Sequence, residues 1–236
     1  MELGEIFSDA LAYPFSNIKA LVLYVILGII LGIAIAGTLV GVLAGVTADN
    51  VWALAGSGII GIIISLVIGF VITGYELDII KYGIDRRADS PGIDFVRQFI
   101  NGVKYLVVNI VYMIIPIIIT AVLSVIFQNW IVTIVGVILA IIFSLALIMA
   151  QCRLAKTDEL GNALAVGEAI GDISRVGFLK VILFIIILAI ISFILFFICG
   201  LIAQWNSTVG GIILGILSVY LVFFVGRATG LLYSDV

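Results

Sequence analysis

The 236-residue chain contains no histidine, only two cysteines and three prolines, and charged residues make up just 11% of it. Without histidine or a cysteine cluster, the common ligand sets for zinc and haem are missing. A serine hydrolase triad is excluded because it needs a histidine base. The GxxxxGK(S/T) motif that binds nucleotide phosphates is also missing. We therefore expect a protein that is not an enzyme, with no catalytic residue, no cofactor and no metal.

Charge of either sign is scarce, with 11 Lys and Arg against 14 Asp and Glu and a net charge of −3. The acids lie among the bases, so we expect no nucleic-acid partner. The two cysteines, Cys152 and Cys199, fall at ends of apolar segments that we place on opposite membrane faces, about 30 Å apart. We expect no disulfide, because the Cα atoms of a disulfide lie within about 7 Å of each other.

Apolar sequence, by contrast, is abundant: 64% of the residues are hydrophobic and the mean hydropathy is +1.43. A soluble domain of this size could not bury so much apolar surface, so lipid must be the solvent for most of the chain. We predict an all-α integral membrane protein with six transmembrane helices, forming a single transmembrane domain over residues 1–236. The predicted spans cover residues 18–46, 53–80, 105–127, 130–152, 181–203 and 209–232.

Amphipathic segments precede the three pairs of spans. Residues 3–11 predict a short helix on the membrane surface, which we expect Pro14 to end. Ser90 and Pro91 predict the start of a second surface helix, which lies flat on the membrane before the third span. In the next long polar passage, Asp158 is the predicted N-cap of a third surface helix.

The order of an interfacial amphipathic helix followed by a transmembrane hairpin occurs three times, which predicts three tandem repeats. The repeat units cover residues 1–80, 81–156 and 157–236. Lys104 and Lys180 begin the first span of their hairpins 76 residues apart, and Gly74, Ala150 and Gly226 recur at the same step near the hairpin ends. Six unrelated spans would have to produce these coincidences by chance.

All eleven Lys and Arg lie on the side of the two chain ends and the long connectors, and the short turns carry none. Cytoplasmic loops of membrane proteins are rich in Lys and Arg. This distribution predicts a multi-pass protein of the cell membrane with both the N- and the C-terminus cytoplasmic. The three tryptophans, one per short turn, are then expected to anchor the outer face.

The middle of each predicted span is free of charge, which argues against ion-coupled transport. Three groups of acids near the span ends could hold a metal or act on a lipid headgroup, but we favour a solvated, charge-balanced surface. They are Glu76 with Asp78, Asp85 with Asp89, and Glu168 with Asp172. The candidates for contact with anionic lipid headgroups are Arg86, Arg87, Arg97 and Lys104.

Short motifs in the first half of the chain carry a resemblance to a known family. They are Ala12-Tyr13-Pro14 before Lys19, Gly74-Tyr75 near the end of the second span, Phe95 followed by Gly102 and Lys104, and Pro116 in the third span. In these the chain resembles a mainly archaeal family of multi-spanning membrane proteins, domain of unknown function 4013. The resemblance covers nearly the whole chain. It implies an integral membrane protein of unknown activity and supplies no catalytic residue.

We favour a non-enzymatic membrane scaffold or lipid-interacting protein that acts through its surface helices, with membrane lipids as partners. An alternative is a channel or facilitator for a small or apolar solute, with the hairpins arranged around a pseudo-threefold axis. A further alternative is a lipid-modifying enzyme that uses the acids named above. A homo-oligomer and a membrane-protein partner both stay open.

Overall fold

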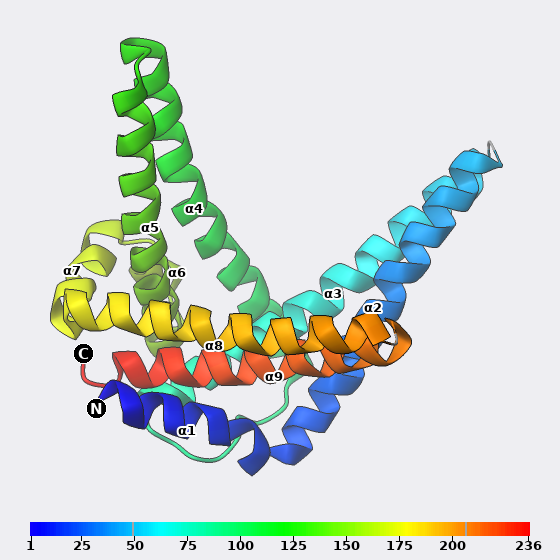
Figure 1. Ribbon diagram of the computed structural model, residues 1–236, viewed down its shortest axis with the longest axis horizontal. Coiled ribbons are helices and arrows are strands. Elements are labelled where there is room, and N and C mark those ends of the chain that lie inside the picture. Colours follow the sequence, from blue (N-terminus) through cyan, green and yellow to red (C-terminus); the bar gives the residue numbers. More distant parts are fainter. Residues whose placement is uncertain (49, 206) are drawn as a thin grey trace.

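The fold is described from a computed structural model that covers residues 1–48, 50–205 and 207–236 (Figure 1). Within these ranges the chain forms helices and no β-strand. In chain order the helices are α1 (Leu3–Ser16), α2 (Ile18–Thr47), α3 (Val51–Ile84), α4 (Phe95–Phe127), α5 (Trp130–Thr157), α6 (Leu160–Ala163), α7 (Val166–Val176), α8 (Phe178–Trp205) and α9 (Ser207–Tyr233). Residues 49 and 206, which belong to two of the predicted short turns, lie outside the described ranges.

Six helices are long and apolar enough to cross a membrane, namely α2, α3, α4, α5, α8 and α9. This confirms the all-α class and the six predicted spans. The shortest has 27 residues and the longest 34, which corresponds to about 40 to 50 Å at 1.5 Å per residue. Because the hydrocarbon core of a bilayer is about 30 Å thick, each helix is long enough to extend beyond it.

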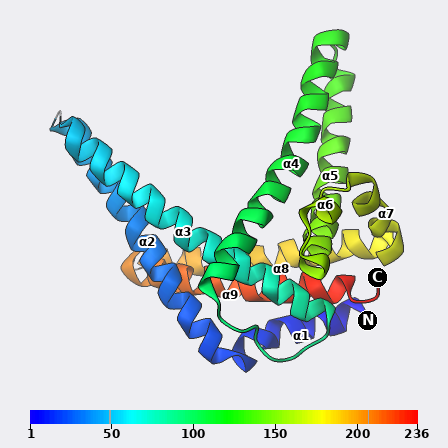
Figure 2. The same cartoon turned by 180° about the vertical axis from the view of Figure 1, so that it is seen from behind.

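The long helices form three hairpins, α2–α3, α4–α5 and α8–α9, which diverge from a shared region (Figures 1 and 2). We call this region the polar base. It consists of α1, the start of α2, the end of α3, residues 85–94, the first turns of α4, the last turns of α5, α6, α7, the end of α9 and both chain ends. The chain ends meet there, since the amino nitrogen of Met1 lies 2.7 Å from a carboxylate oxygen of Asp235.

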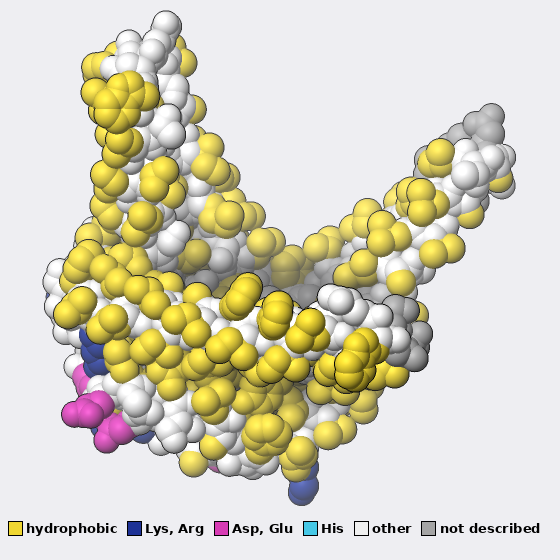
Figure 3. All heavy atoms as spheres, viewed as in Figure 1, with side chains coloured by type: hydrophobic (Ala, Val, Ile, Leu, Met, Phe, Trp, Pro, Cys, Tyr) yellow, Lys and Arg dark blue, Asp and Glu magenta, His cyan; other side chains and the backbone are white. Residues whose placement is uncertain are grey.

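Tight packing is concentrated near the polar base. Three of the four buried residues of α2, namely Ala20, Leu21 and Tyr24, lie close to the start of the helix. The ring of Tyr24 stacks on that of Tyr75 with centroids 4.0 Å apart, and Phe223 on α9 packs against both. Most large apolar side chains farther along the hairpins are exposed, and Figure 3 shows them covering the hairpins while the charged side chains gather at the base. The outer parts of the hairpins therefore present apolar surface to the bilayer.

The prediction that Pro14 ends the first helix is wrong, because α1 continues through it to Ser16. Proline removes one backbone N–H and usually disfavours a helix. Here Tyr13 and Pro14 are both buried, and the Tyr13 hydroxyl donates a hydrogen bond to the carbonyl oxygen of Asp89 at 3.2 Å. Packing against the rest of the base thus outweighs the local preference.

The predicted flat surface helix before the third span is also wrong. The chain from Ser90 to Asp94 is not helical, Asp94 is the N-cap, and α4 then runs without a break to Phe127. The carboxylate of Asp94 accepts a hydrogen bond from the backbone N–H of Arg97 at 3.1 Å, which satisfies one of the free N–H groups of the first turn. Pro116 lies inside α4 and does not interrupt it.

The third surface segment differs from its prediction as well. Asp158 is not an N-cap but the C-cap of α5, in the left-handed conformation with φ 60°. Two short helices follow it, α6 and α7, in place of one. Ala169 and Ile173 lie on the buried side of α7, whereas Ile170 is exposed. The tandem-repeat arrangement stays a prediction.

Two glycines allow α3 and α4 to approach closely. A Cβ atom added to Gly102 on α4 would lie 2.0 Å from the carbonyl oxygen of Phe70 on α3. A Cβ atom added to Gly74 on α3 would lie 1.7 Å from the carbonyl oxygen of Gln98 on α4. Because the obstructing atoms belong to the backbone, no side-chain movement could make room for a methyl group. Small residues at such contacts are typical of helix pairs in membranes.

We therefore expect Gly102→Ala to lower the free energy of unfolding by about 1–3 kcal/mol, because α3 and α4 would have to move apart. The measurement is a denaturant titration in detergent micelles. The matched control is Gly32→Ala on α2, where an added Cβ meets nothing within 4 Å. That variant should keep its stability or gain up to about 1 kcal/mol from the higher helix propensity of alanine. Equal stability of the two variants would contradict the close approach.

Candidate functional site

The first cluster of polar residues lies where α3 meets the start of α4. Asp78 on α3 is only 4% exposed, and Arg97 donates two hydrogen bonds to its carboxylate, at 3.1 and 2.9 Å. Gln98 and Asn101 donate to the same carboxylate at 3.4 and 3.3 Å. Tyr24 on α2 donates to the side-chain oxygen of Gln98 at 2.6 Å. A single buried carboxylate thus connects α3 to α4 directly and to α2 through one further side chain.

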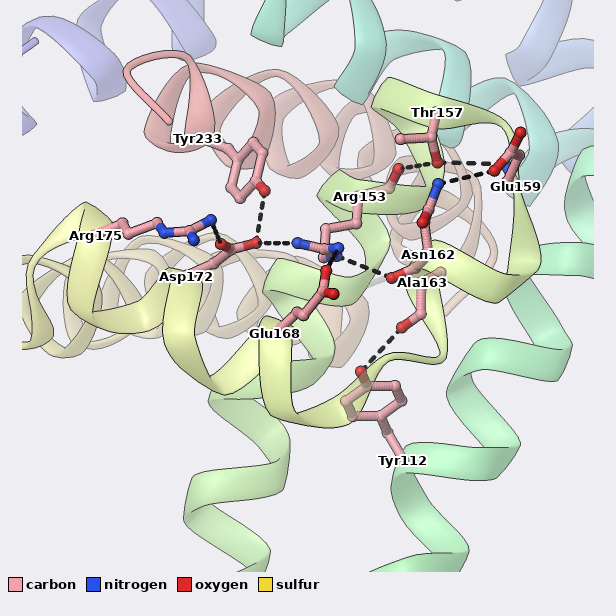
Figure 4. Close-up of polar contacts among 10 residues, drawn as sticks. All are labelled: Tyr112, Arg153, Thr157, Glu159, Asn162, Ala163, Glu168, Asp172, Arg175 and Tyr233. Carbon is pink, nitrogen blue, oxygen red and sulfur yellow. Dashed lines mark hydrogen bonds and ion pairs between the residues drawn. The ribbon is translucent and has the colours of Figure 1, made fainter.

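The second cluster joins α5, α7 and the end of α9 (Figure 4). Asp172 on α7 is fully buried. Its carboxylate accepts hydrogen bonds from Arg153 at 3.0 Å, Arg175 at 2.9 Å and the Tyr233 hydroxyl at 2.6 Å. Arg153 also forms an ion pair with Glu168, so its guanidinium lies between two carboxylates.

The third cluster surrounds Arg227 on α9, which is only 2% exposed. Its guanidinium donates to the carboxylate of Asp9 on α1 at 2.6 and 3.2 Å. It also donates to the carbonyl oxygens of Tyr82 and Arg87, and it lies 4.9 Å from the centre of the Tyr13 ring. Hydrogen bonds and the aromatic face together compensate for the loss of water around this buried cation.

These clusters follow one pattern. In each, a charged residue near the base end of a hairpin's second helix pairs with an opposite charge on another segment. The partners are Arg97 in the first turn of α4, Asp172 on α7 and Asp9 on α1. The partners of the first and second pairs are 19 residues apart in the sequence. The third pair joins α9 to α1 across 218 residues and so closes a ring of three contacts. Among the described residues, every buried side-chain nitrogen or oxygen has a hydrogen-bond partner, as expected of a specific polar network.

The four basic residues predicted to contact lipid headgroups each have a carboxylate partner within the protein. The pairs are Arg86 with Asp235, Arg87 with Asp89, Arg97 with Asp78, and Lys104 with Asp158. Arg97 and Lys104 line one pocket of about 340 Å³ together with Asp94 and Asp158. Arg86 and Arg87 are not among the residues that line it. Contact of these four cations with headgroups stays a prediction.

The predicted acidic groups have different surroundings. Glu76 and Asp78 face different neighbours, since Glu76 lies against Gly226 on α9 while Asp78 binds Arg97 on α4. Glu168 and Asp172 are brought together by a shared arginine. Within the described ranges, no three potential metal-ligating side chains are grouped. The two buried acids of the base, Asp78 and Asp172, therefore bind arginines.

Hydrogen bonding and burial shift the titration of groups in the polar base outside the spans. Burial raises the pKa of the Tyr13 hydroxyl, which keeps it protonated as a donor. The guanidinium of Arg87 lowers the pKa of Asp89, and the N-terminal ammonium group lowers that of Asp235. A depressed carboxyl pKa contributes stability that is present above the unfolded value and is lost as the pH falls through the folded value. These two contacts should therefore weaken below about pH 4.

Two apolar grooves run along the hairpins. The larger has a volume of about 580 Å³ and lies between α4 and α5, from Tyr112 and Leu147 at its base end to Ser124 and Thr133 near the turn. The smaller, of about 260 Å³, lies between α3 and α4. The hydroxyls of Thr120, Ser124 and Ser144 in the larger groove donate to backbone carbonyls four residues earlier in their own helices. Their donors are thus used within the protein, and the grooves suit an apolar ligand.

The ring of ion pairs was not found from the sequence. We grouped the acids with their neighbours in the chain, whereas Asp78 and Asp172 bind arginines 19 residues away. One available signal was the repetition of that 19-residue step. Another was Arg227, the single charge in an otherwise apolar predicted span. Its partner Asp9 lies near the other end of the chain, and no local pattern indicates that contact.

Because Arg153 is largely buried, the loss of Asp172 should leave its guanidinium with only the exposed carboxylate of Glu168 to balance its charge. We expect Asp172→Ala to lower the free energy of unfolding by about 3–5 kcal/mol. Glu168→Ala removes the other carboxylate from the same arginine, but Glu168 is 64% exposed, so its loss should cost at most about 1 kcal/mol. Denaturant titration in micelles measures both values. Similar losses would show that burial does not determine the strength of these contacts.

Comparison with protein families gives one result. The family described as "Protein of unknown function (DUF4013)" matches residues 57–204, more than half of the chain. The matched region extends from α3 to α8 and includes both partners of the first two ion pairs. No curated protein and no solved structure matches the chain. The chain is therefore a member of the DUF4013 family, as its sequence motifs predict.

Proposed function

We propose that this protein is a non-enzymatic membrane scaffold that binds lipids along its hairpins. The observation that carries this proposal is the divergence of three apolar hairpins from one tightly packed base (Figures 1 and 2). In a bilayer, lipid chains or another membrane protein must fill the space between diverging hairpins, because exposed apolar surface at that depth contacts whatever surrounds it. The protein would thus hold lipids in a fixed arrangement.

The groove between α4 and α5 supports lipid binding. From Tyr112 to Ser124 it extends over 12 residue steps of α4, or about 18 Å. This length is close to half of a bilayer core of about 30 Å, which is the depth of one leaflet. An extended hydrocarbon chain of one lipid could therefore lie along it.

The ion pairs support a structural role for the charged residues. Asp78 and Asp172, the two most buried acids, each accept hydrogen bonds from at least one arginine. A catalytic acid or base must reach the proton that it transfers. These carboxylates are occupied by the protein, so a lipid-modifying enzyme is the weaker interpretation. A channel is also weaker, because the two apolar grooves lie between neighbouring helices and not along a shared axis of the hairpins.

The proposal also includes the location of the protein in the cell membrane, the cytoplasmic side of its termini and the three tandem repeats. Among the described residues, the Lys and Arg side chains lie at the base ends of the hairpins, which supports the cell membrane as location with both termini cytoplasmic. The recurrence of one ion pair per hairpin junction supports three tandem units. A homo-oligomer, a membrane-protein partner and an archaeal source remain predictions.

Lipid retention tests the proposed function. Native mass spectrometry of the detergent-purified protein should show bound lipid. Ala140→Phe, which places a ring in the groove between α4 and α5, should reduce the number of retained lipids by about one. The matched control is Ala189→Phe on α8, an exposed alanine outside that groove, which should change nothing.

Four results would count against this proposal. Absence of lipid from the wild-type protein would remove the main support for a lipid-binding scaffold. Equal losses of lipid in the two variants would show that the groove between α4 and α5 is not a lipid site. Conversion of added lipids by the wild-type protein that Glu76→Gln abolishes would favour the enzyme. Solute flux in protein-containing liposomes would favour the channel.

A further inference from the structure

We propose that the pocket between the start of α4 and the end of α5 binds a phospholipid headgroup that carries both a phosphate and an ammonium group. This headgroup pocket has a volume of about 340 Å³, and its charged lining consists of Asp94, Arg97, Lys104 and Asp158. It thus contains two cations and two anions. The inference rests on the proposed lipid-binding function and names the lipid class that the base would select.

The two cations retain free hydrogen-bond donors. An ammonium group has three N–H donors and a guanidinium has five. Lys104 uses two of its donors, both on Asp158, at 2.9 and 2.6 Å. Arg97 uses three, two on Asp78 and one on the carbonyl oxygen of Gly92. One donor of Lys104 and two of Arg97 therefore remain for the oxygens of a phosphate, which such groups bind well.

The two carboxylates retain free acceptor oxygens. The Oδ1 atom of Asp94 accepts the backbone N–H of Arg97, and the Oδ1 atom of Asp158 accepts the Lys104 ammonium. In each residue, Oδ2 accepts no hydrogen bond from a described residue. Both side chains are also held in place, Asp94 by its N-cap hydrogen bond at the start of α4 and Asp158 by its ion pair with Lys104. They can therefore accept hydrogen bonds from a ligand ammonium group without rearranging.

A lipid fits this pocket better than a soluble phosphate compound. Val96 and Ile100 line the same pocket, and both side chains are well exposed. From this point α4 continues into its apolar span, so a headgroup in the pocket would have its acyl chains beside that helix. The balance of two cations and two anions also disfavours a purely anionic headgroup, because the free carboxylate oxygens would repel it.

Three lipids with identical acyl chains distinguish the possible ligands. Phosphatidylethanolamine offers a phosphate and an ammonium group that donates hydrogen bonds. Phosphatidylcholine has no N–H donor, and phosphatidylglycerol has no cation. In native mass spectrometry of the full-length protein with equal amounts of the three, we expect phosphatidylethanolamine to be retained about tenfold more strongly than either of the others.

Two substitutions test the role of the carboxylates while keeping the local structure. Asparagine caps helices well and also tolerates the left-handed conformation. Asp94→Asn combined with Asp158→Asn should therefore fold but lose both ammonium acceptors. We expect retention of phosphatidylethanolamine relative to phosphatidylglycerol to fall by about tenfold, so that phosphatidylethanolamine loses its advantage.

A pair of lysine substitutions tests the phosphate contact. Lys104→Met should weaken retention of phosphatidylethanolamine and phosphatidylglycerol alike, because the Lys104 ammonium would donate to the phosphate of both lipids. Lys19→Met removes a lysine near the start of another hairpin, outside the pocket, and should leave lipid retention unchanged.

Several results would contradict the proposal that this pocket binds a headgroup. Equal retention of the three lipids by the wild-type protein, or equal effects of the two lysine variants, would show that the headgroup is not recognised there. Binding of free phosphoethanolamine as strong as that of the lipid would refute the need for acyl chains. If lipids are retained without headgroup preference, headgroup recognition is contradicted while the proposed scaffold function is not. If no lipid is retained at all, both proposals are contradicted.

Discussion

A charged side chain that leaves water must find a partner of opposite charge, and this requirement organises the base of the protein. Asp78, Asp172 and Arg227 are nearly or fully buried, and each is paired across two elements. Replacing a buried pair by apolar residues is often neutral for stability, whereas removing one partner is costly. We infer that the pairs mainly determine which segment packs against which hairpin.

The contrast between base and hairpins connects the structure to the proposed function. The base combines aromatic stacking, close helix contacts at Gly74 and Gly102, and fully paired polar groups. Farther out, the hairpins have few buried side chains and no charge pair among the described residues. A rigid base with diverging apolar arms suits a protein that organises lipids, because the arms reach through the hydrocarbon region while the base holds them apart.

The sequence predicted the features that depend on local composition. Long apolar runs between polar passages gave the six spans, and Gln128-Asn129 was correctly placed as the turn between α4 and α5. Predictions that depend on distant contacts failed. Pro14 stays within α1 because the base packs around it. The predicted flat surface helix is instead the start of α4, where Gln98 and Asn101 donate hydrogen bonds to the buried Asp78. The partner of Arg227 lies at the far end of the chain, where no periodicity could reveal it.

The divergence of the hairpins is the central claim, and a distance measurement in lipid tests it most directly. Trp52 and Trp130, at the turns of two different hairpins, are well exposed and suit replacement by spin-labelled cysteines in a background without Cys152 and Cys199. Packed helices lie 8–10 Å apart, so a closed six-helix bundle would place these turns within about 20 Å. Double electron–electron resonance in nanodiscs should give a clearly longer mean distance. A narrow distribution at or below about 20 Å would contradict the account.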